Sequence, residues 1–482
     1  MNPKVVLVEL NEVPYRVIDA YCERRRQSAL ARVMERSDQF ETVTEDKLAL
    51  DPWISWPTLH RGVTDETHHI LHLGQTLTET DARYPPIWRL LKESRARVGV
   101  FGSLHSSSIP SDVGEYCFYL PDYFDAEVFA HPASLQAFQE LSLAMTRQSA
   151  RNVTRKIPLS AAARFIAGAP RIGLTVSTVA SSLAHLAREV INPALRIRRR
   201  AYQPLLMADL FLRQLEREQP DFSTFYTNHV AAAMHRYWGA MFPGDYSQPL
   251  DAAWIAQYRE EILFAMDKFD AIVARLMRFI DAHPDFTLVM ASSMGQAAIP
   301  AEKTHQFLTI LDLAKFMARL GVPRDRWQAR PAMVPCQCII VAEECRPTLL
   351  SALDSLTVGG AAMVADQRPR MPMSYDERER GFFQLYVAFD NYAGGAAAQV
   401  GGRSVTLEEL GLGFMAHEDG VNCTAQHVAS GSLIVHRPGG NGARRHGRER
   451  ISTLDIAPSI LNALGISKPN YMRGAPSIQL SA

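Results

Sequence analysis

The chain has 482 residues, enough for one large domain with insertions or about three domains of average size. Hydrophobic residues make up 47% and charged residues 21%, a composition that excludes an intrinsically disordered chain, a collagen-like repeat or a coiled coil. The 51 Lys and Arg residues balance 51 Asp and Glu residues, so no global field draws the protein to nucleic acid, and we expect no nucleic-acid partner.

The N-terminal sequence does not have the pattern of a secretory signal. The apolar run from Val5 to Val8 is short, and Glu9 follows it directly. The longest apolar candidate for a membrane span is interrupted by Arg164 and Arg171. We therefore expect a cytoplasmic protein without a transmembrane segment, for which peripheral contact with a membrane stays open; the sequence predicts no oligomeric state.

Expected strands and helices alternate along the chain. The first strand, from Val5 to Val8, is apolar on both faces, as in a parallel sheet, and a helix from Tyr15 to Arg36 follows it. The later elements are a helix at 87–94, strand at 98–101, helix at 206–218, strand at 222–226, helix at 258–283, strand at 286–291, strand at 433–435 and helix at 453–464. This order predicts an α/β fold whose mostly parallel sheet is flanked by helices on both faces.

Two stretches interrupt the alternation. Residues 141–205 are rich in Ala, Leu and Arg, which indicates a helical insertion with a solvated basic face, or else a lid that meets an acidic or lipid-linked partner. Residues 310–420 read as a small α/β cap, in which the cysteines near Cys336 belong to a strand rather than to a metal site. The core then comprises residues 1–140, 206–309 and 421–482.

Several separate stretches share the order and spacing of one known family. They are VVLVELNE (5–12), WISWPTLHRGVTDETHHI (53–70), PPIWRLLKESRARVGVFGS (85–103), FYTNHVAAAMHRYW (225–238), FTLVMASSMGQ (286–296), QHVASGSLIVHRPG (426–439) and STLDIAPSILNALGISKPNYMRG (452–474). Together they resemble the alkaline phosphatase superfamily, in particular its type I phosphodiesterase and nucleotide pyrophosphatase branch, over both ends and the middle of the chain.

This resemblance implies a hydrolase or transferase that acts on a phosphate, phosphodiester or sulfate ester. Such proteins hold two divalent cations, usually zinc, which activate a Ser or Thr nucleophile and stabilise charge on the phosphoryl or sulfuryl group. The two large insertions suggest a covered, sizeable pocket, so a nucleotide-sugar or glycan precursor is the expected kind of substrate.

The metal positions depart from the family pattern. The acidic ligands of the family fall on Asn11, Ala231 and Ser293 in this chain, and a histidine ligand falls on Met294. Side chains such as Ala and Met cannot support a two-zinc centre, so the resemblance does not extend to that centre.

Two ligand positions do match the family by residue type, namely His235 and His427. With a carboxylate from Glu9 or Glu12 they would hold a single cation, for which zinc is the expected metal, and three protein ligands with an open position suit catalysis. We assign Glu12 to this site, with His229 as a further candidate ligand.

Catalytic candidates lie in the first motifs. Glu9, at a strand end, could act as a general base, and Ser55 or Thr58 as nucleophile. In a gapless comparison the nucleophile falls near Pro52 instead, and the alternative for Ser55 is a helix cap, because Pro57 suits a first helical turn. The candidate substrate-binding residues are Asn11, Trp53, Asn228, Ser292 and Ser293.

Two other functions stay open. The loss of acidic ligands favours a catalytically inactive family member that binds a glycan, nucleotide or protein partner. A metal-independent transferase would use Glu9 or His229 as its base.

Overall fold

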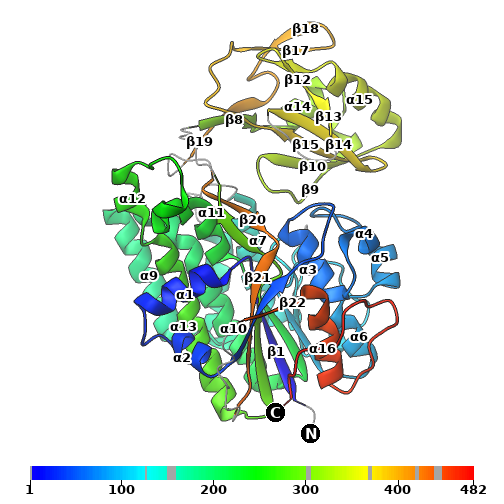
Figure 1. Ribbon diagram of the computed structural model, residues 1–482. Coiled ribbons are helices and arrows are strands. Elements are labelled where there is room, and N and C mark those ends of the chain that lie inside the picture. The colour runs from blue at the N-terminus through cyan, green and yellow to red at the C-terminus, as the bar shows by residue number, and fades with distance from the viewer. Residues whose placement is uncertain are drawn as a thin grey trace. The chain divides into compact units, whose positions relative to one another are not determined.

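The computed structural model describes residues 3–124, 127–148, 159–299, 306–366, 372–417, 423–438 and 448–481. It divides into two compact units, shown in Figure 1. The first unit combines Met1–Gln148, Val153–Pro300 and Cys423–Ala482, and the second combines Ser149–Asn152 with Ala301–Asn422. Each unit has a hydrophobic core of its own.

The first unit is built on an eight-stranded sheet in the order β22-β2-β21-β6-β1-β5-β3-β4. The strand β1 lies inside this sheet and runs parallel to both β5 and β6, whereas β21 runs antiparallel to β6 and β2. The mostly parallel sheet is therefore confirmed. The bounds are β1 Lys4–Leu10, β2 Asp38–Val43, β3 Val98–Phe101, β4 Phe118–Leu120, β5 Phe222–Thr227, β6 Phe286–Ala291, β21 Ser430–His436 and β22 Glu449–Ser452.

Helices cover both faces of this sheet, as the sequence predicts. Alternate residues of β1 point to opposite faces, so Val6 and Val8 enter one core while Val5 and Leu7 enter the other. One face carries α1 Tyr15–Arg24, α2 Ala29–Glu35, α10 Gln203–Glu218, α11 His229–Met241 and α13 Glu261–Ala282, and the other carries α3 Pro52–Arg61, α6 Ile87–Glu93 and α16 Ile456–Ala463 (Figure 1).

The single helix expected from Tyr15 to Arg36 is in fact two helices. The first ends at Arg24, and the second begins after Ser28, whose hydroxyl accepts a hydrogen bond from the backbone N–H of Ala31. A serine in this position satisfies a free N–H of the first turn, which favours a new helix start over continuation of the old one.

The segment expected to be a helical insertion is helical where the structure describes it. It contains α7 Gln136–Gln148, α8 Leu159–Ile172, α9 Val176–Ile191 and the short η3 Pro193–Ala201. The first unit also contains α4 Asp65–His68, α5 Thr78–Arg83, α12 Ala252–Tyr258 and a two-stranded sheet of β7 Gly295–Ala298 and β20 Ala425–Val428. Among the described residues, no helix has both the length and the apolar character needed to cross a bilayer.

The second unit is a small α/β structure, as expected for the cap. Its largest sheet has five strands in the order β13-β14-β15-β10-β9, and the cysteine-containing segment forms its strand β10. The main elements are β8 Gln306–Ile310, α14 Leu313–Arg319, β9 Trp327–Arg330, β10 Cys336–Val341, α15 Arg346–Asp354, β13 Val364–Ala365, β14 Met373–Glu379, β15 Phe382–Val387 and β19 Leu412–Ala416.

Candidate metal centre

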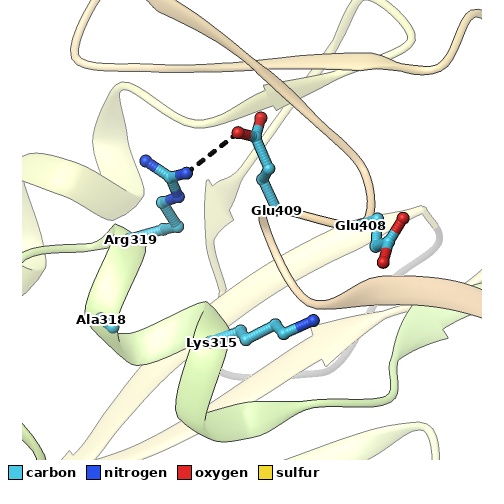
Figure 2. Close-up of a pocket in the computed structure, with 5 residues that line it drawn as sticks. All are labelled: Lys315, Ala318, Arg319, Glu408 and Glu409. Atoms are coloured by element: carbon cyan, nitrogen blue, oxygen red, sulfur yellow. Dashed lines mark hydrogen bonds and ion pairs between the residues drawn. The ribbon is translucent and has the colours of Figure 1, made fainter.

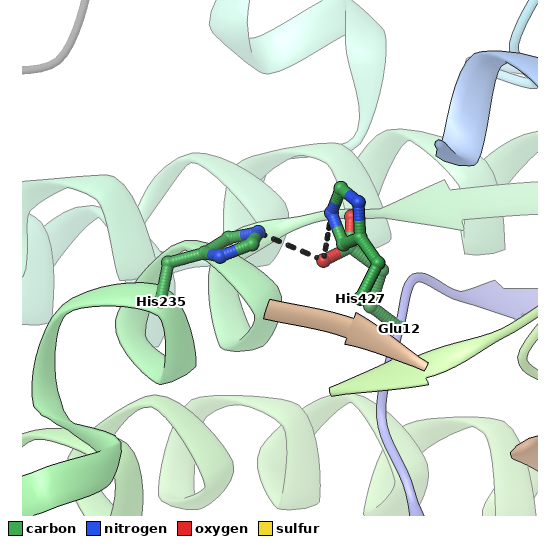
Figure 3. A group of neighbouring side chains, drawn as sticks. All are labelled: Glu12, His235 and His427. Atoms are coloured by element: carbon green, nitrogen blue, oxygen red, sulfur yellow. Dashed lines mark ion pairs between the residues drawn. The ribbon is translucent and has the colours of Figure 1, made fainter. Parts of the chain in front are cut away.

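Three side chains from distant parts of the chain converge in the first unit. Glu12 follows the end of β1, His235 lies on α11, and His427 lies on β20. The carboxylate Oε2 of Glu12 is 3.0 Å from Nε2 of His235 and 3.3 Å from Nε2 of His427. Figure 3 shows both rings directed at this one carboxylate. A search of the described residues for three or more His, Cys, Asp or Glu side chains that could share a metal ion finds these three, whose ligand atoms all lie within 4.8 Å of one another.

The backbone and two amides fix the position of the Glu12 carboxylate. Glu12 has φ 60°, a left-handed conformation that costs a residue with a side chain about 1–2 kcal/mol. Its Oε1 accepts a hydrogen bond of 2.6 Å from Asn11 Nδ2, and its Oε2 accepts one from Gln296 Nε2. Strained backbone that the surroundings hold in place is typical of functional sites, and here the strain aims a buried carboxylate at two imidazoles.

Backbone carbonyls set the tautomers of both histidines. Nδ1 of His235 lies 3.1 Å from the carbonyl oxygen of Ala425, and Nδ1 of His427 lies 2.8 Å from that of Leu50. A carbonyl oxygen can only accept, so each Nδ1 carries a proton and donates it, which leaves Nε2 for a ligand. Metal-bound histidines are oriented by the same kind of hydrogen bond from their other ring nitrogen.

Without a metal, the three groups hold one another charged. Burial disfavours the charged form of each histidine. The attraction of the Glu12 carboxylate is stronger than this effect, and it raises the pKa of His235 to about 10 and that of His427 to about 11. Burial likewise opposes ionisation of Glu12, and the two imidazolium rings overcome it and hold the Glu12 pKa well below its usual value. Protons therefore occupy the Nε2 atoms that a cation would need, so cation and protons compete.

The donor set fits a zinc ion. Two imidazole nitrogens and one carboxylate oxygen are the protein ligands of a familiar type of catalytic zinc site, in which a fourth position is left open. The side chain of Glu12 is 3% exposed, whereas His235 and His427 are 32% and 20% exposed, so the histidine side of the group meets solvent. The carboxylate of Asp51 lies next to this side, 3.3 Å from Nδ1 of His427.

Glu9 belongs to a different, fully buried cluster. It still lies within β1 and points to the opposite face of the sheet from Val8, where its Oε1 lies 2.7 Å from His60 Nε2 and accepts a hydrogen bond from Ser103. Among the described residues, its Oε2 has no hydrogen-bond partner. The His60 ring packs against Trp56 and Trp88. Glu9 is thus a buried partner of a histidine and does not join the Glu12 group.

Ser55 lies on α3 and is fully buried. Its hydroxyl is 2.8 Å from that of Ser293 and also contacts the sulfur of Met294, so Ser293 and Met294 both pack against Ser55. The expected helix cap at Ser55 is wrong, because α3 begins at Pro52 and has Pro57 in its interior.

Pro57 has no N–H to donate to the carbonyl four residues earlier, at Trp53. That carbonyl accepts a hydrogen bond from His105 Nε2 instead, at 2.7 Å, which keeps it satisfied inside the protein. Trp53 itself is half-buried at the start of the helix.

Thr58 is also fully buried on α3. Its hydroxyl donates to Asp46 Oδ1 at 2.6 Å and lies 2.9 Å from His68 Nε2. The Nδ1 of His68 accepts the backbone N–H of Ile70, so Nε2 carries the ring proton and donates to Thr58. Burial lowers the pKa of His68 to about 2 and raises that of Asp46 to about 6. Asp46, and not His68, is therefore the group positioned to accept the Thr58 proton.

The predicted substrate-binding residues serve several structural roles. Asn11 donates to Glu12 and to Asn228 Oδ1, 2.8 Å away, and accepts from the indole N–H of Trp56. Asn228 precedes α11 and is half-buried. These two amides therefore form a chain of hydrogen bonds that ends on the Glu12 carboxylate.

Ser292 and His229 are engaged elsewhere. The hydroxyl of Ser292 donates to the carbonyl oxygens of Leu10 and Val13 and so ties the end of β6 to the loop after β1. His229 Nδ1 is 2.6 Å from the hydroxyl of Thr227, its Nε2 is 3.1 Å from the carbonyl of Ala265, and burial lowers its pKa to about 4. The structure does not bring His229 to the other predicted metal ligands.

Sequence reasoning did not include Gln296 among the site residues. It lies on β7 directly opposite His427 on β20, and its amide donates to Glu12 and to the carbonyl of Ala231. Gln296 lies two residues after Met294, within the stretch 286–296 that resembles a ligand motif of the superfamily, and this position could have pointed to it. The backbone carbonyls of Ala425 and Leu50, which accept from His235 and His427, cannot be predicted from the sequence, because any residue type has a carbonyl.

A hollow in the second unit, drawn in Figure 2, is lined by Lys315, Ala318, Arg319, Glu408 and Glu409. Arg319 Nη2 lies 3.2 Å from Glu409 Oε1, and about half of each side chain is exposed, 46% and 49%. Water screens an ion pair of this kind, so it contributes little. None of the predicted site residues lines this hollow.

Comparison with known proteins yields no matching family model and no matching curated sequence. Similar solved structures include human ectonucleotide pyrophosphatase/phosphodiesterase 5, with a TM-score of 0.42 and 10% identity over 98% of this chain and 97% of that chain. The murine protein of the same name has a TM-score of 0.40 and 10% identity over 97% and 96% of the two chains. Phosphonoacetate hydrolase from Sinorhizobium meliloti 1021, in complex with phosphonoformate, has a TM-score of 0.41 and 13% identity over 96% of each chain.

At these TM-scores and identities, the similarity carries no information about metal, substrate or mechanism. The chemistry of this chain follows from its own side chains.

Proposed function

We propose that the chain is a metal-dependent hydrolase of phosphate, phosphodiester or sulfate esters that uses one divalent cation. Glu12, His235 and His427 would hold this cation, and their donor set favours zinc. The observation that carries the proposal is the convergence of two Nε2 atoms on one buried carboxylate oxygen, at 3.0 and 3.3 Å.

A cation in this place supplies Lewis-acid polarisation of a phosphoryl or sulfuryl oxygen. The chain's own residues keep the ligands in place. Asn11 and Gln296 hold the Glu12 carboxylate, and the carbonyls of Leu50 and Ala425 keep the ligand lone pairs of both histidines on Nε2.

The identity of the nucleophile is a finer part of the proposal. Ser55 and Thr58 are both fully buried, so either would need the start of α3 to move before it met a substrate. Asp51 precedes α3, is 31% exposed, and lies beside His427. Its carboxylate is the acidic group positioned to accept a proton at the solvent-facing side of the site.

The proposal includes the substrate class and the cellular location that the sequence predicts for this protein. A nucleotide-sugar or glycan precursor joined through a phosphate would present the anionic oxygens that a cation binds. Localisation in the cytoplasm is part of the same proposal.

The test is hydrolysis of 4-nitrophenyl phosphate, bis(4-nitrophenyl) phosphate and 4-nitrophenyl sulfate by chelated and zinc-loaded protein. We expect turnover that returns with zinc and falls at least about a hundredfold in the double variant His235→Gln/His427→Gln. His283→Gln is the matched control, since His283 bonds to the carbonyl of Phe279 at the end of α13. Zinc-loaded protein that binds the metal and turns over none of the three esters would contradict hydrolysis of these ester classes.

One observation favours an inactive binding protein as the second candidate. The positions of the family's remaining ligands carry Ala231 and Met294, and Met294 packs on the buried Ser55. In that case nucleotides or glycans would raise the melting temperature without turnover, with no dependence on zinc.

A further inference from the structure

A helix on the surface of a soluble protein normally turns its apolar face to the core and its polar face to water. The helix α9, Val176–Ile191, does the opposite. Val176, Val190 and Ile191 are 85%, 85% and 86% exposed, and Leu183 is 60% exposed. Three exposed alanines lie between them. We call this set the apolar stripe: Val176, Ala180, Leu183, Ala184, Ala187, Val190 and Ile191.

The stripe is continuous along the helix. At 3.6 residues per turn its seven members fall within an arc of about 120°, and at 1.5 Å per residue they extend over about 22 Å. Isolated exposed apolar residues are ordinary, whereas a continuous row of this length marks a surface that meets another apolar phase.

The opposite face of α9 is polar and is turned into the protein. His185 Nε2 lies 2.9 Å from Glu189 Oε1, and Arg199 of η3 pairs with the same carboxylate. Thr178 accepts a hydrogen bond from Arg275, which also pairs with Asp209. These buried contacts fix the rotation of the helix, so the apolar stripe cannot turn inward without breaking them.

The segment that contains the stripe has a net positive charge, although three of its arginines form ion pairs: Arg164 with Glu140, Arg198 with Glu261 and Arg199 with Glu189. The described segment 159–205 contains seven arginines and a single acidic residue, Glu189, which gives it a formal net charge of +6. The whole chain is formally neutral, so the rest of it has a charge of −6. Arg188 is exposed on α9 at the edge of the stripe, where its stem can lie along the apolar surface while its guanidinium reaches a phosphate.

We propose that α9 is a membrane-docking helix that lies in the plane of an anionic lipid bilayer. The apolar stripe would enter the boundary between headgroups and acyl chains, the exposed Arg188 would bind a lipid phosphate, and the net positive charge of 159–205 would attract the anionic surface. Charge complementarity selects this occupant over a second copy of the chain, because two surfaces of net positive charge repel each other.

The test is flotation of the full-length protein with vesicles of phosphatidylcholine alone or with about 30% phosphatidylglycerol. The stripe variant Leu183→Gln/Val190→Gln/Ile191→Gln keeps good helix formers at exposed positions, so the helix should survive. The matched control is Leu311→Gln/Val364→Gln/Phe414→Gln, at three exposed apolar residues of the second unit. Arg188→Glu tests the charge contribution separately.

We expect wild-type protein and the control to float with the anionic vesicles and to stay behind with neutral ones. The stripe variant should lose at least about tenfold in partitioning, and Arg188→Glu about fivefold. Failure of the wild type to float with anionic vesicles would overturn the proposal, as would equal flotation of the stripe variant. A wild-type dimer in solution that the stripe variant converts to monomer would overturn it in favour of self-association. None of these results depends on metal binding or turnover.

Discussion

At the scale of single residues, Glu12 determines the properties of the site. One carboxylate oxygen faces two imidazole Nε2 atoms, so the same three side chains form either an ion cluster with protons or a cation site without them. Zinc binding must therefore release protons, and its affinity should rise with pH.

The metal-free protein should show the opposite pH dependence in its stability. The folded pKa of His427 is raised to about 11, so its contribution is fully present below the unfolded value of about 6.5 and is lost as the pH rises toward 11. The free energy of unfolding of chelated wild type should exceed that of His427→Gln most at pH 6. The difference should shrink by up to about 1.4 kcal/mol per pH unit toward pH 9.

Urea denaturation of both proteins at pH 6, 7.5 and 9 measures this difference, and comparison of the two proteins cancels the titratable groups that do not interact with His427. The Glu12 pKa is held well below its usual value, so Glu12 stays ionised throughout this range. A difference that is constant or that grows with pH would show that His427 is not paired as an imidazolium.

The resemblance proposes His235 and His427 as ligands by residue type, and the assignment of Glu12 rather than Glu9 to the same site had no structural reason behind it. Both follow the apolar run Val5–Val8, and the choice depends on where the strand ends. The strand continues to Leu10, which turns Glu9 to the face covered by α3, and the left-handed backbone of Glu12 then redirects the chain. The pattern of apolar residues contains neither fact.

At the scale of elements, the two-stranded sheet of β7 and β20 holds the site together. Gln296 and His427 lie opposite each other in it, and the neighbouring pair is Gly295 with Val428. A Cβ on Gly295 would lie 2.1 Å from the carbonyl oxygen of Ser430, so this position leaves no room for a side chain.

We predict that Gly295→Ala lowers the free energy of unfolding by about 1–3 kcal/mol, because the backbone must shift to admit the methyl group. Gly114→Ala is the control, since a Cβ there meets nothing within 4 Å, and it should change stability by no more than about 0.5 kcal/mol. Urea denaturation measures both. Equal stabilities for Gly295→Ala and wild type would mean that β7 is not held at the described distance from Ser430, at the start of β21.

The alternation of apolar runs predicted the strands that carry the motifs, but not the start of α3 or the strand β2. Both Pro52 and Pro57 suit the first turn of a helix, so the sequence leaves two possible starts. The hydrogen bond from His105 to the Trp53 carbonyl, which allows Pro57 inside the helix, is a tertiary contact that no local pattern shows. The strand β2, DQFETV, contains few apolar residues, and its pairing with β21 and β22 decides its conformation.

At the scale of the whole molecule, the two units have separate cores, and all three proposed ligands belong to the first. A ligand stabilises only the cooperative unit that binds it. We therefore predict that excess zinc raises the melting temperature of one calorimetric transition and leaves a second unchanged. Zinc-induced shifts of both transitions by the same amount would contradict independent units.

The central claim is that Glu12, His235 and His427 bind one divalent cation. Elemental analysis of purified protein after dialysis against zinc and buffer tests it most directly. We predict about one zinc per chain for the wild type and for His283→Gln, and much less than one for Glu12→Gln and for His235→Gln/His427→Gln. Wild-type protein without bound metal, or ligand variants that retain a full equivalent, would contradict the assignment of this site.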